Sequence, residues 1–128
     1  MPESNDNCDI KRWDLLKRRL QNVSPRQALE MMENAESPLV LIDCRRPDEY
    51  QKARLPDALH VDYLDYDFWE RIARLSPVET YLVYCNSCRR STRACTLMQN
   101  GGFSRVYNLD GGLNRWLEEL GKEGLELD

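Results

Sequence analysis

Apolar positions along the chain form two patterns, short unbroken runs and stripes with helical spacing. The runs at 39–42 and 80–84 are rich in branched and aromatic residues, which is typical of buried strands. Residues 59–61 and 105–109 predict two further strands, because turn-forming or polar residues follow each of them. Stripes with helical spacing separate these runs, so the chain alternates between strands and helices.

The first helical stripe lies near the N-terminus and consists of Ile10, Trp13, Leu16 and Leu20. We expect this helix to pack on its own domain with its basic residues in solvent. The alternative is that the Ile10–Leu20 helix contacts a partner or forms a dimer.

The second predicted helix has a clear start, because Ser24 supplies an N-cap and Pro25 suits the first helical position. Its buried face is predicted to consist of Ala28, Leu29 and Met32. Further helical segments are predicted from residue 48, at 68–75 with Asp67 as cap, before the Gly101-Gly102 stop, and at 113–120.

Short strands alternating with helices, without an internal repeat, predict an α/β fold with a parallel sheet and helices on both faces. The 128 residues suffice for one domain core. We divide the chain into a tail with an extra amphipathic helix at 1–22, a domain at 23–121 and an acidic tail at 122–128. We expect the acidic tail to be loose.

Composition then narrows the functional classes. Hydrophobic residues make up 41% of the chain and charged residues 31%, which is typical of a soluble globular protein. The net charge of −4 disfavours nucleic acid and membrane partners, and no apolar run approaches the ~20 residues of a membrane span. Five cysteines at irregular spacing, without a secretory signal, predict free thiols and a cytoplasmic location.

The strongest chemical signal follows the strand at 80–84. Cys85 lies between this strand and a helix, so we expect it at the carboxyl edge of the sheet, facing the positive end of that helix. Arg89, Arg90 and Arg93 add local positive charge to an otherwise acidic chain. Unpaired backbone N–H groups, the helix dipole and the arginines all favour a thiolate, so Cys85 is the predicted nucleophile.

Three segments together resemble the rhodanese family of sulfurtransferases in its single-domain form. The first reads Leu-Ile-Asp-Cys-Arg-Arg-Pro-Asp-Glu-Tyr at 41–50 and continues as Leu-Pro-Asp-Ala-Leu-His-Val at 55–61. The second runs from Val83 to Ser91, and the third is Val-Tyr-Asn-Leu-Asp-Gly-Gly at 106–112 with Trp116. They occur in the family's order and cover about residues 24–120.

The resemblance implies a rhodanese-like three-layer sandwich with about five parallel strands. It also implies that Cys85 carries a sulfane sulfur as a persulfide and that Arg90 closes the loop. The substrate-binding loop would consist of Asn86, Ser87, Cys88, Arg89 and Ser91, and Ser91 would also start the helix. Asp43 and Arg45 match family positions that brace the fold near the loop.

The implied reaction moves a sulfane sulfur from a small anion such as thiosulfate, or from a persulfide, to a thiol, cyanide or a protein cysteine. No cofactor is implied. A metal site is not expected either, because a lone Cys-x-x-Cys with one histidine is a poor zinc site.

The sequence departs from the family pattern at three places. Cys88 stands where the family usually has glycine, so we expect a backbone conformation that non-glycine residues tolerate. Ala53-Arg54 replaces a Gly-His pair, and Asp57 replaces a second glycine.

Three other functions compete with sulfur transfer. Cysteine phosphatases have a similar strand–loop–helix arrangement, but their arginine would fall on position 91, which is a serine here. Cys85-x-x-Cys88 also fits a thiol–disulfide redox protein, with Cys88 as a resolving thiol unless its side chain points out of the loop. A catalytically silent rhodanese-like binding or regulatory module is the third. The remaining buried-type residues are predicted to be structural: Cys44, Cys95, His60, Phe103 and Trp116.

Overall fold

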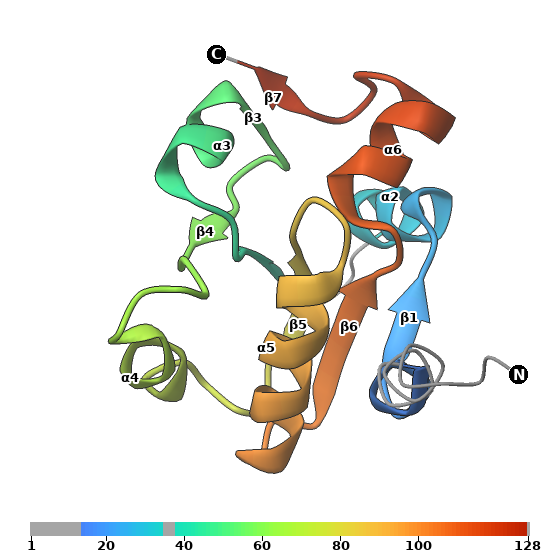
Figure 1. The fold of residues 1–128 in the computed structure, drawn as a ribbon. Helices are drawn as coiled ribbons and strands as arrows, with labels where there is room; N and C mark the ends of the chain where they lie inside the picture. The colour runs from blue at the N-terminus through green and yellow to red at the C-terminus, as the bar shows by residue number, and fades with distance from the viewer. Residues whose placement is uncertain (1–13, 35–37, 128) are drawn as a thin grey trace, which may run out of the picture.

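Figure 1 shows the computed structural model of the protein, which describes residues 14–34 and 38–127. Residues 14–18 are helical. The elements that follow are β1 (Gln21–Val23), α2 (Pro25–Glu33), β2 (Leu39–Asp43), α3 (Pro47–Lys52), β3 (Ala53–Arg54), β4 (Leu59–His60), α4 (Phe68–Ala73), β5 (Thr80–Tyr84), α5 (Arg89–Asn100), β6 (Arg105–Leu109), α6 (Gly112–Leu120) and β7 (Glu126–Leu127).

The centre of the fold is a five-stranded sheet with the order β1-β6-β5-β2-β4, in which all neighbours are parallel. The register pairs Ile42 with Val83 and Asp43 with Tyr84, so β2 and β5 end side by side. All carboxyl ends therefore meet at one edge of the sheet, as the alternation of strands and helices predicted.

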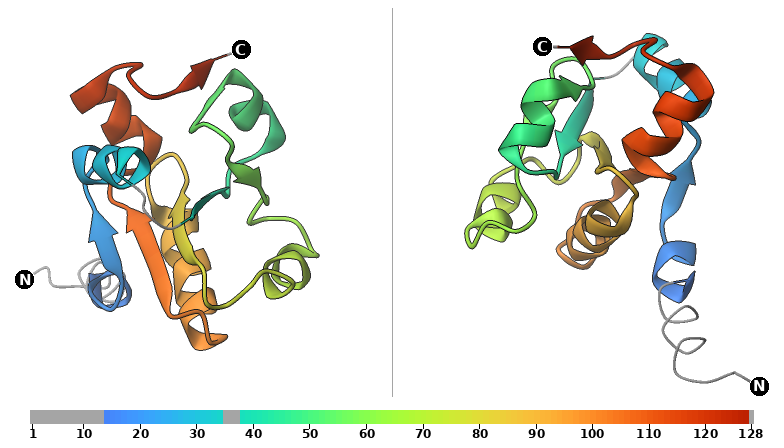
Figure 2. Two further views of the ribbon diagram at one scale, coloured as in Figure 1. Left: turned by 180° about the vertical axis from the view of Figure 1, so that it is seen from behind. Right: turned by 45° about the horizontal axis from the view of Figure 1, so that its top comes forward.

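Side chains alternate across the strands and build a separate core on each face. Ile42 and Val83 face α4 and α5, and their cluster includes Phe68 and Met98. The intervening residues of these strands face α2 and α6, in a cluster centred on Trp116. The right-hand view of Figure 2 shows these two helical layers on opposite sides of the sheet. The predicted α/β fold with helices on both faces is confirmed.

The N-terminal segment adds a strand that the pattern did not predict. β1 is short and partly polar, and it pairs with the outer side of β6, Val23 lying opposite Leu109. The boundary that we placed after residue 22 falls inside this strand. Leu20 is buried in the core, whereas Ile10 and Trp13 of the predicted stripe lie outside the described residues.

The C-terminal segment is not loose over residues 122–127. β7 pairs antiparallel with β3, Leu127 lying opposite Ala53. The Trp116 indole N–H donates a hydrogen bond to the Glu123 carbonyl oxygen at 2.8 Å. The expectation failed because strand pairing and one indole donor, rather than apolar side chains, hold this segment.

The predicted helix starts agree with the structure at α2 and differ from it at α4 and α5. Ser24 caps α2 as predicted, through a capping box with Gln27. Asp67 occupies the N-cap position of α4, but its side chain makes no capping hydrogen bond. α5 begins at Arg89, two residues before the expected start at Ser91, because Cys88 adopts the N-cap position. Among the described residues, no helix is long and apolar enough to cross a bilayer.

Candidate active site

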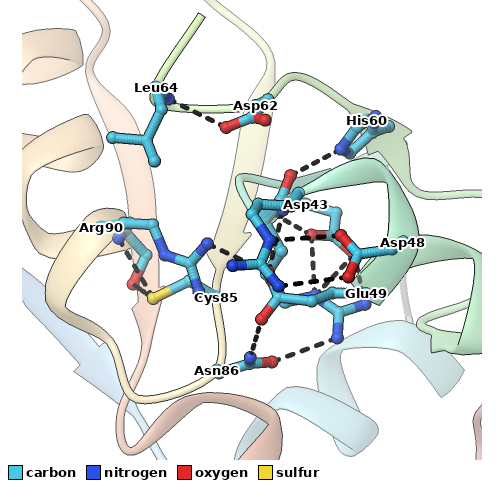
Figure 3. Close-up of polar contacts among 12 residues, drawn as sticks. Asp43, Asp48, Glu49, His60, Asp62, Leu64, Cys85, Asn86 and Arg90 are labelled. Carbon is cyan, nitrogen blue, oxygen red and sulfur yellow. Dashed lines mark hydrogen bonds and ion pairs between the residues drawn. The ribbon is translucent and has the colours of Figure 1, made fainter.

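The loop that carries Cys85 joins β5 to α5 at the carboxyl edge of the sheet (Figure 3). It is short because β5 ends at Tyr84 and α5 begins at Arg89. The parallel pairing of β5 with β2 brings the residues that follow β2, including Arg45, next to this loop. Predicted site residues from two distant segments therefore meet here.

The Cys85 sulfur lies inside the loop, and the residue is only 1% exposed. Ser91 N–H donates to Cys85 Sγ at 3.4 Å, and Ser91 Oγ lies 3.5 Å from the same sulfur. As a thiol, Cys85 donates to the hydroxyl, and as a thiolate it accepts from it. Ser91 therefore holds the sulfur in both states, although it does not start the helix as we expected.

The loop offers backbone donors for an anion. Among the described residues, no acceptor takes a hydrogen bond from the N–H groups of Ser87, Cys88 or Arg90. These groups lie at the N-terminus of α5, where the helix dipole adds positive potential. A set of unpaired amides at a helix N-terminus is suited to binding an anion.

The start of α6 holds the loop from the other side. Leu113 N–H donates to the Cys85 carbonyl oxygen and Asn114 N–H to the Asn86 carbonyl oxygen, both at 2.9 Å. Gly112 has a φ of +62°, and a Cβ there would lie 2.4 Å from the Cys85 oxygen. Only glycine allows this approach, and it keeps the loop carbonyls turned away from the sulfur. Sequence reasoning noted the Gly111-Gly112 pair as a turn and missed this contact.

Asp43 and Arg45 form the brace that the resemblance implied. Arg45 Nη2 donates to Asp43 Oδ2 at 2.7 Å, and both residues are buried. Burial alone would lower the pKa of Arg45, but hydrogen bonds and charge from Asp43 outweigh it and raise that pKa. Arg45 Nη1 also donates to Asn86 Oδ1 at 3.1 Å, so the buried pair fixes the second residue of the loop.

Glu49 is a site residue that sequence reasoning did not single out. Its Oε1 accepts from Arg90 Nη1 at 3.1 Å, and its Oε2 accepts from the Asn86 side-chain amide. Burial raises the pKa of Glu49, but hydrogen bonds from Arg46 N–H and Arg90 lower it below its ordinary value. The carboxylate therefore stays ionised and sets the direction of the Arg90 guanidinium.

Cys88 contradicts our expectation about the backbone. Its φ is 78° and its ψ is 2°, in the left-handed region that favours glycine. The loop thus keeps the conformation for which the family uses glycine, and a side chain with a Cβ has been fitted into it. Cys88 is 5% exposed, so its thiol does not lie in solvent.

The other predicted structural residues are buried or hydrogen-bonded as expected. Cys44 and Cys95 are fully buried, and burial is the main reason that the pKa of each thiol is raised. Trp116 and Phe103 belong to the core. His60 stacks on a tyrosine ring and its Nε2 lies 2.6 Å from the Arg45 carbonyl oxygen. Across the described residues, no group of three or more histidine, cysteine or acidic side chains could hold a metal ion.

Fold and loop together define a class of α/β proteins with a cysteine loop between a central strand and a helix N-terminus. Within this class, the model of the Rhodanese-like domain family matches residues 24–119, so the chain belongs to the rhodanese-like domain family. The predicted family and fold are confirmed.

Similar proteins and solved structures also include sulfurtransferases. The chain is 29% identical over 96 residues to "Thiosulfate sulfurtransferase GlpE" of Pseudomonas savastanoi, covering 75% of this chain and 86% of the relative. It is 32% identical over 78 residues to "Sulfurtransferase" of Allochromatium vinosum, covering 61% and 71%. The polysulfide-sulfur transferase homodimer of Wolinella succinogenes superposes with a TM-score of 0.76 at 27% identity, over 93% of this chain and 88% of that one.

Other relatives are longer. The chain spans 48% of YrkF of Bacillus subtilis and 52% of HIGH ARSENIC CONTENT 1 of Arabidopsis thaliana. Sulfurtransferase names at about this level of identity support a rhodanese-type sulfurtransferase.

Proposed function

We propose that this protein is a sulfurtransferase in which Cys85 carries the transferred sulfur as a persulfide. The observation that supports this most directly is the hydrogen bond that Cys85 Sγ accepts from the Ser91 N–H in the first turn of α5. Together with the unpaired N–H groups of the loop, this donor stabilises the negative charge of the thiolate and of the persulfide that replaces it, as an oxyanion hole does. The proposed location is the cytoplasm, where the free thiols stay reduced.

In the first half-reaction, the Cys85 thiolate attacks the outer sulfur of thiosulfate. The S–S bond of the donor breaks as a new S–S bond forms on Cys85, and sulfite leaves with the bonding electron pair. Glu49 engages one nitrogen of Arg90, and the other donors of that guanidinium are proposed to bind the sulfonate oxygens. A persulfide is the alternative donor.

In the second half-reaction, an acceptor attacks the outer sulfur of the Cys85 persulfide. Cyanide leaves as thiocyanate, and a thiolate on a small molecule or a protein cysteine becomes a new persulfide. The electron pair of the broken S–S bond returns to Cys85, which regenerates the thiolate. Ser91 supplies the hydroxyl and the N–H that stabilise this product.

The test combines sulfur loading with turnover. Wild type incubated with thiosulfate should gain one sulfur atom on Cys85, located by mass spectrometry of its peptides. Cys85→Ser should neither load nor turn over in the thiosulfate:cyanide assay, because a hydroxyl cannot form a persulfide. Cys88→Ala, a matched control that removes the neighbouring thiol, should still load at Cys85. Full turnover by Cys85→Ser would refute the proposed role of Cys85.

The same experiment distinguishes sulfur transfer from the two other candidate functions. A redox protein would form a Cys85–Cys88 disulfide instead of retaining sulfur, and a binding module would gain no sulfur. The Wolinella relative is described as a homodimer, and a dimer or partner contact through the Ile10–Leu20 helix stays a proposal for this chain.

A further inference from the structure

Two of the described ion pairs lie beside the Cys85 loop, and they differ in exposure. The side chains of Asp43 and Arg45 are 0% and 5% exposed, so this pair is closed to small molecules. The side chains of Glu49 and Arg90 are 19% and 25% exposed, so the second pair stays in reach of solvent. Of the two, the Glu49–Arg90 pair is therefore the one that a substrate entering the loop can touch.

The Glu49 carboxylate contacts both sides of the loop (Figure 3). Its Oε1 accepts from Arg90 Nη1 at 3.1 Å, and its Oε2 accepts from the Asn86 side-chain amide. Asn86 directly follows Cys85 along the chain, and Arg90 lies in the first turn of α5. The pair thus bridges the two ends of the loop that carries the reactive sulfur.

Both members of the pair keep hydrogen-bonding capacity for a bound molecule. A carboxylate offers roughly four acceptor sites, and three of those on Glu49 are taken by Arg90, Asn86 and the Arg46 N–H. A guanidinium offers about five donors, of which Glu49 takes one. Among the residues that the structure describes, no acceptor takes a hydrogen bond from the other Arg90 donors. Glu49 can therefore accept one more donor, and Arg90 can bind an anionic group.

The charges of the pair decide which molecules fit it. Burial raises the pKa of Glu49, but hydrogen bonds from the Arg46 N–H and Arg90 lower it below its ordinary value, so the carboxylate is ionised at neutral pH. A substrate with a single charge meets an attractive group and a repulsive group side by side. A substrate with an ammonium and a carboxylate next to each other satisfies both groups at once. An α-amino acid has this arrangement.

We propose that Glu49 and Arg90 bind the ammonium and the carboxylate of an α-amino thiol, so that free cysteine or a close analogue is the sulfur acceptor. The acceptor thiol loses its proton to water, and its thiolate attacks the outer sulfur of the Cys85 persulfide. The S–S bond of the enzyme persulfide breaks, its electron pair returns to Cys85, and a persulfide of the amino thiol leaves. This acceptor class rests on the proposed sulfur transfer, and it makes Glu49 a residue that determines specificity.

The test compares four thiol acceptors on protein loaded with sulfur from thiosulfate. Cysteine carries both charges, cysteamine only the ammonium, 3-mercaptopropionate only the carboxylate, and 2-mercaptoethanol neither. In Glu49→Gln, kcat/KM for cysteine and for cysteamine should fall about five-fold relative to that for 2-mercaptoethanol, mainly through KM. The ratio for 3-mercaptopropionate should not fall. Each ratio is compared with the wild-type ratio, so differences in thiol reactivity cancel.

Two further variants complete the comparison. Arg90→Ala should lower the ratio for 3-mercaptopropionate and leave that for cysteamine, which is the reverse of Glu49→Gln. Asp48→Asn removes a negative charge from the same helix, but its side chain is 60% exposed and pairs with Arg46. This control should keep all ratios within about two-fold of wild type. An equal loss on all four acceptors in Glu49→Gln would mean that Glu49 only holds the loop, and it would overturn the inference.

A second measurement does not depend on sulfur transfer. Unloaded protein reacts with methanethiosulfonates that carry either an ethylammonium or an ethylsulfonate group; the Cys85 thiolate attacks the divalent sulfur, and methanesulfinate leaves. Mass spectrometry of the peptides gives the rate at Cys85. Glu49→Gln should lower the ratio of the ammonium rate to the sulfonate rate several-fold, and Asp48→Asn should not change it. An unchanged ratio in Glu49→Gln would also overturn the inference. If wild type never loads sulfur, the proposed function fails, and this ratio alone decides whether Glu49 selects by charge.

Discussion

Cys88 provides the sharpest stability prediction, because its backbone conformation reverses the usual order of alanine and glycine. The comparison is between Cys88→Gly and Cys88→Ala, which remove the same thiol. At an ordinary position alanine is more stable than glycine by about 0.5–1 kcal/mol, since glycine loses more backbone freedom on folding. At φ 78° a side chain with a Cβ costs about 1–2 kcal/mol, and an N-cap also favours glycine over alanine. Cys88→Gly should therefore be more stable than Cys88→Ala by about 1 kcal/mol.

The assay is urea unfolding followed by tryptophan fluorescence. A difference of about 1 kcal/mol shifts the midpoint by roughly 0.5 M for a protein of this size. The neighbouring Ser87 has no positive φ and serves as the control, at which alanine should be more stable than glycine. If Cys88→Ala equals or exceeds Cys88→Gly in stability, position 88 is not left-handed and the described loop conformation is incorrect.

Three further predictions concern the same site. Arg90→Ala should lower kcat/KM for thiosulfate about ten-fold and Arg89→Ala only about two-fold, because Glu49 orients the Arg90 guanidinium. Equal, mild losses in the two variants would mean that neither arginine positions the donor. Arg45→Met should reduce the free energy of unfolding by about 3–5 kcal/mol in urea titrations, since it leaves a buried carboxylate unpaired, and a loss below about 1 kcal/mol would contradict the brace. After mild peroxide, peptide mapping should find a Cys85–Cys88 disulfide that thiols reverse, whereas equal irreversible inactivation of wild type and Cys88→Ala would exclude a resolving thiol.

The central strands of the sheet were predictable because buried strands consist mainly of apolar residues. β2 and β5 are covered on both faces, so the runs 39–42 and 81–84 within them are apolar and stand out in the sequence. β1 and β7 were missed for the opposite reason. Gln21 and Glu126 are exposed, and these short strands exist only because backbone groups of β6 and β3 lie beside them. Such pairing leaves no hydrophobic signature along the chain.

Some active-site residues were predictable from the sequence and others were not. Cys85, Arg90 and Arg45 were found because their order along the chain carries the family pattern. Glu49 and Gly112 were missed because each acts on a loop far away in sequence, Glu49 through Arg90 and Gly112 through the Cys85 carbonyl. Long-range contacts of this kind depend on how the strands are ordered, which no local pattern records.

The conformation at Cys88 was wrongly predicted because we let residue type decide the backbone. The loop is held by hydrogen bonds from Leu113 and Asn114 to its carbonyl groups and by the start of α5. These contacts outweigh a cost of about 1–2 kcal/mol at one residue. Tertiary constraints therefore fix the loop shape, and the side chain at position 88 adapts to it.

The pairing of β7 with β3 matters for how the protein is handled in the laboratory. Ala53 pairs with Leu127, and its carbonyl oxygen accepts a hydrogen bond from the Arg45 guanidinium, so β7 lies two contacts away from the Asp43–Arg45 pair. Figure 1 shows β7 at the same end of the molecule as β3, where this pairing is made. An affinity tag or fusion partner joined after Asp128 therefore needs a flexible spacer. Removal of β7 would release β3 from the strand that pairs with it.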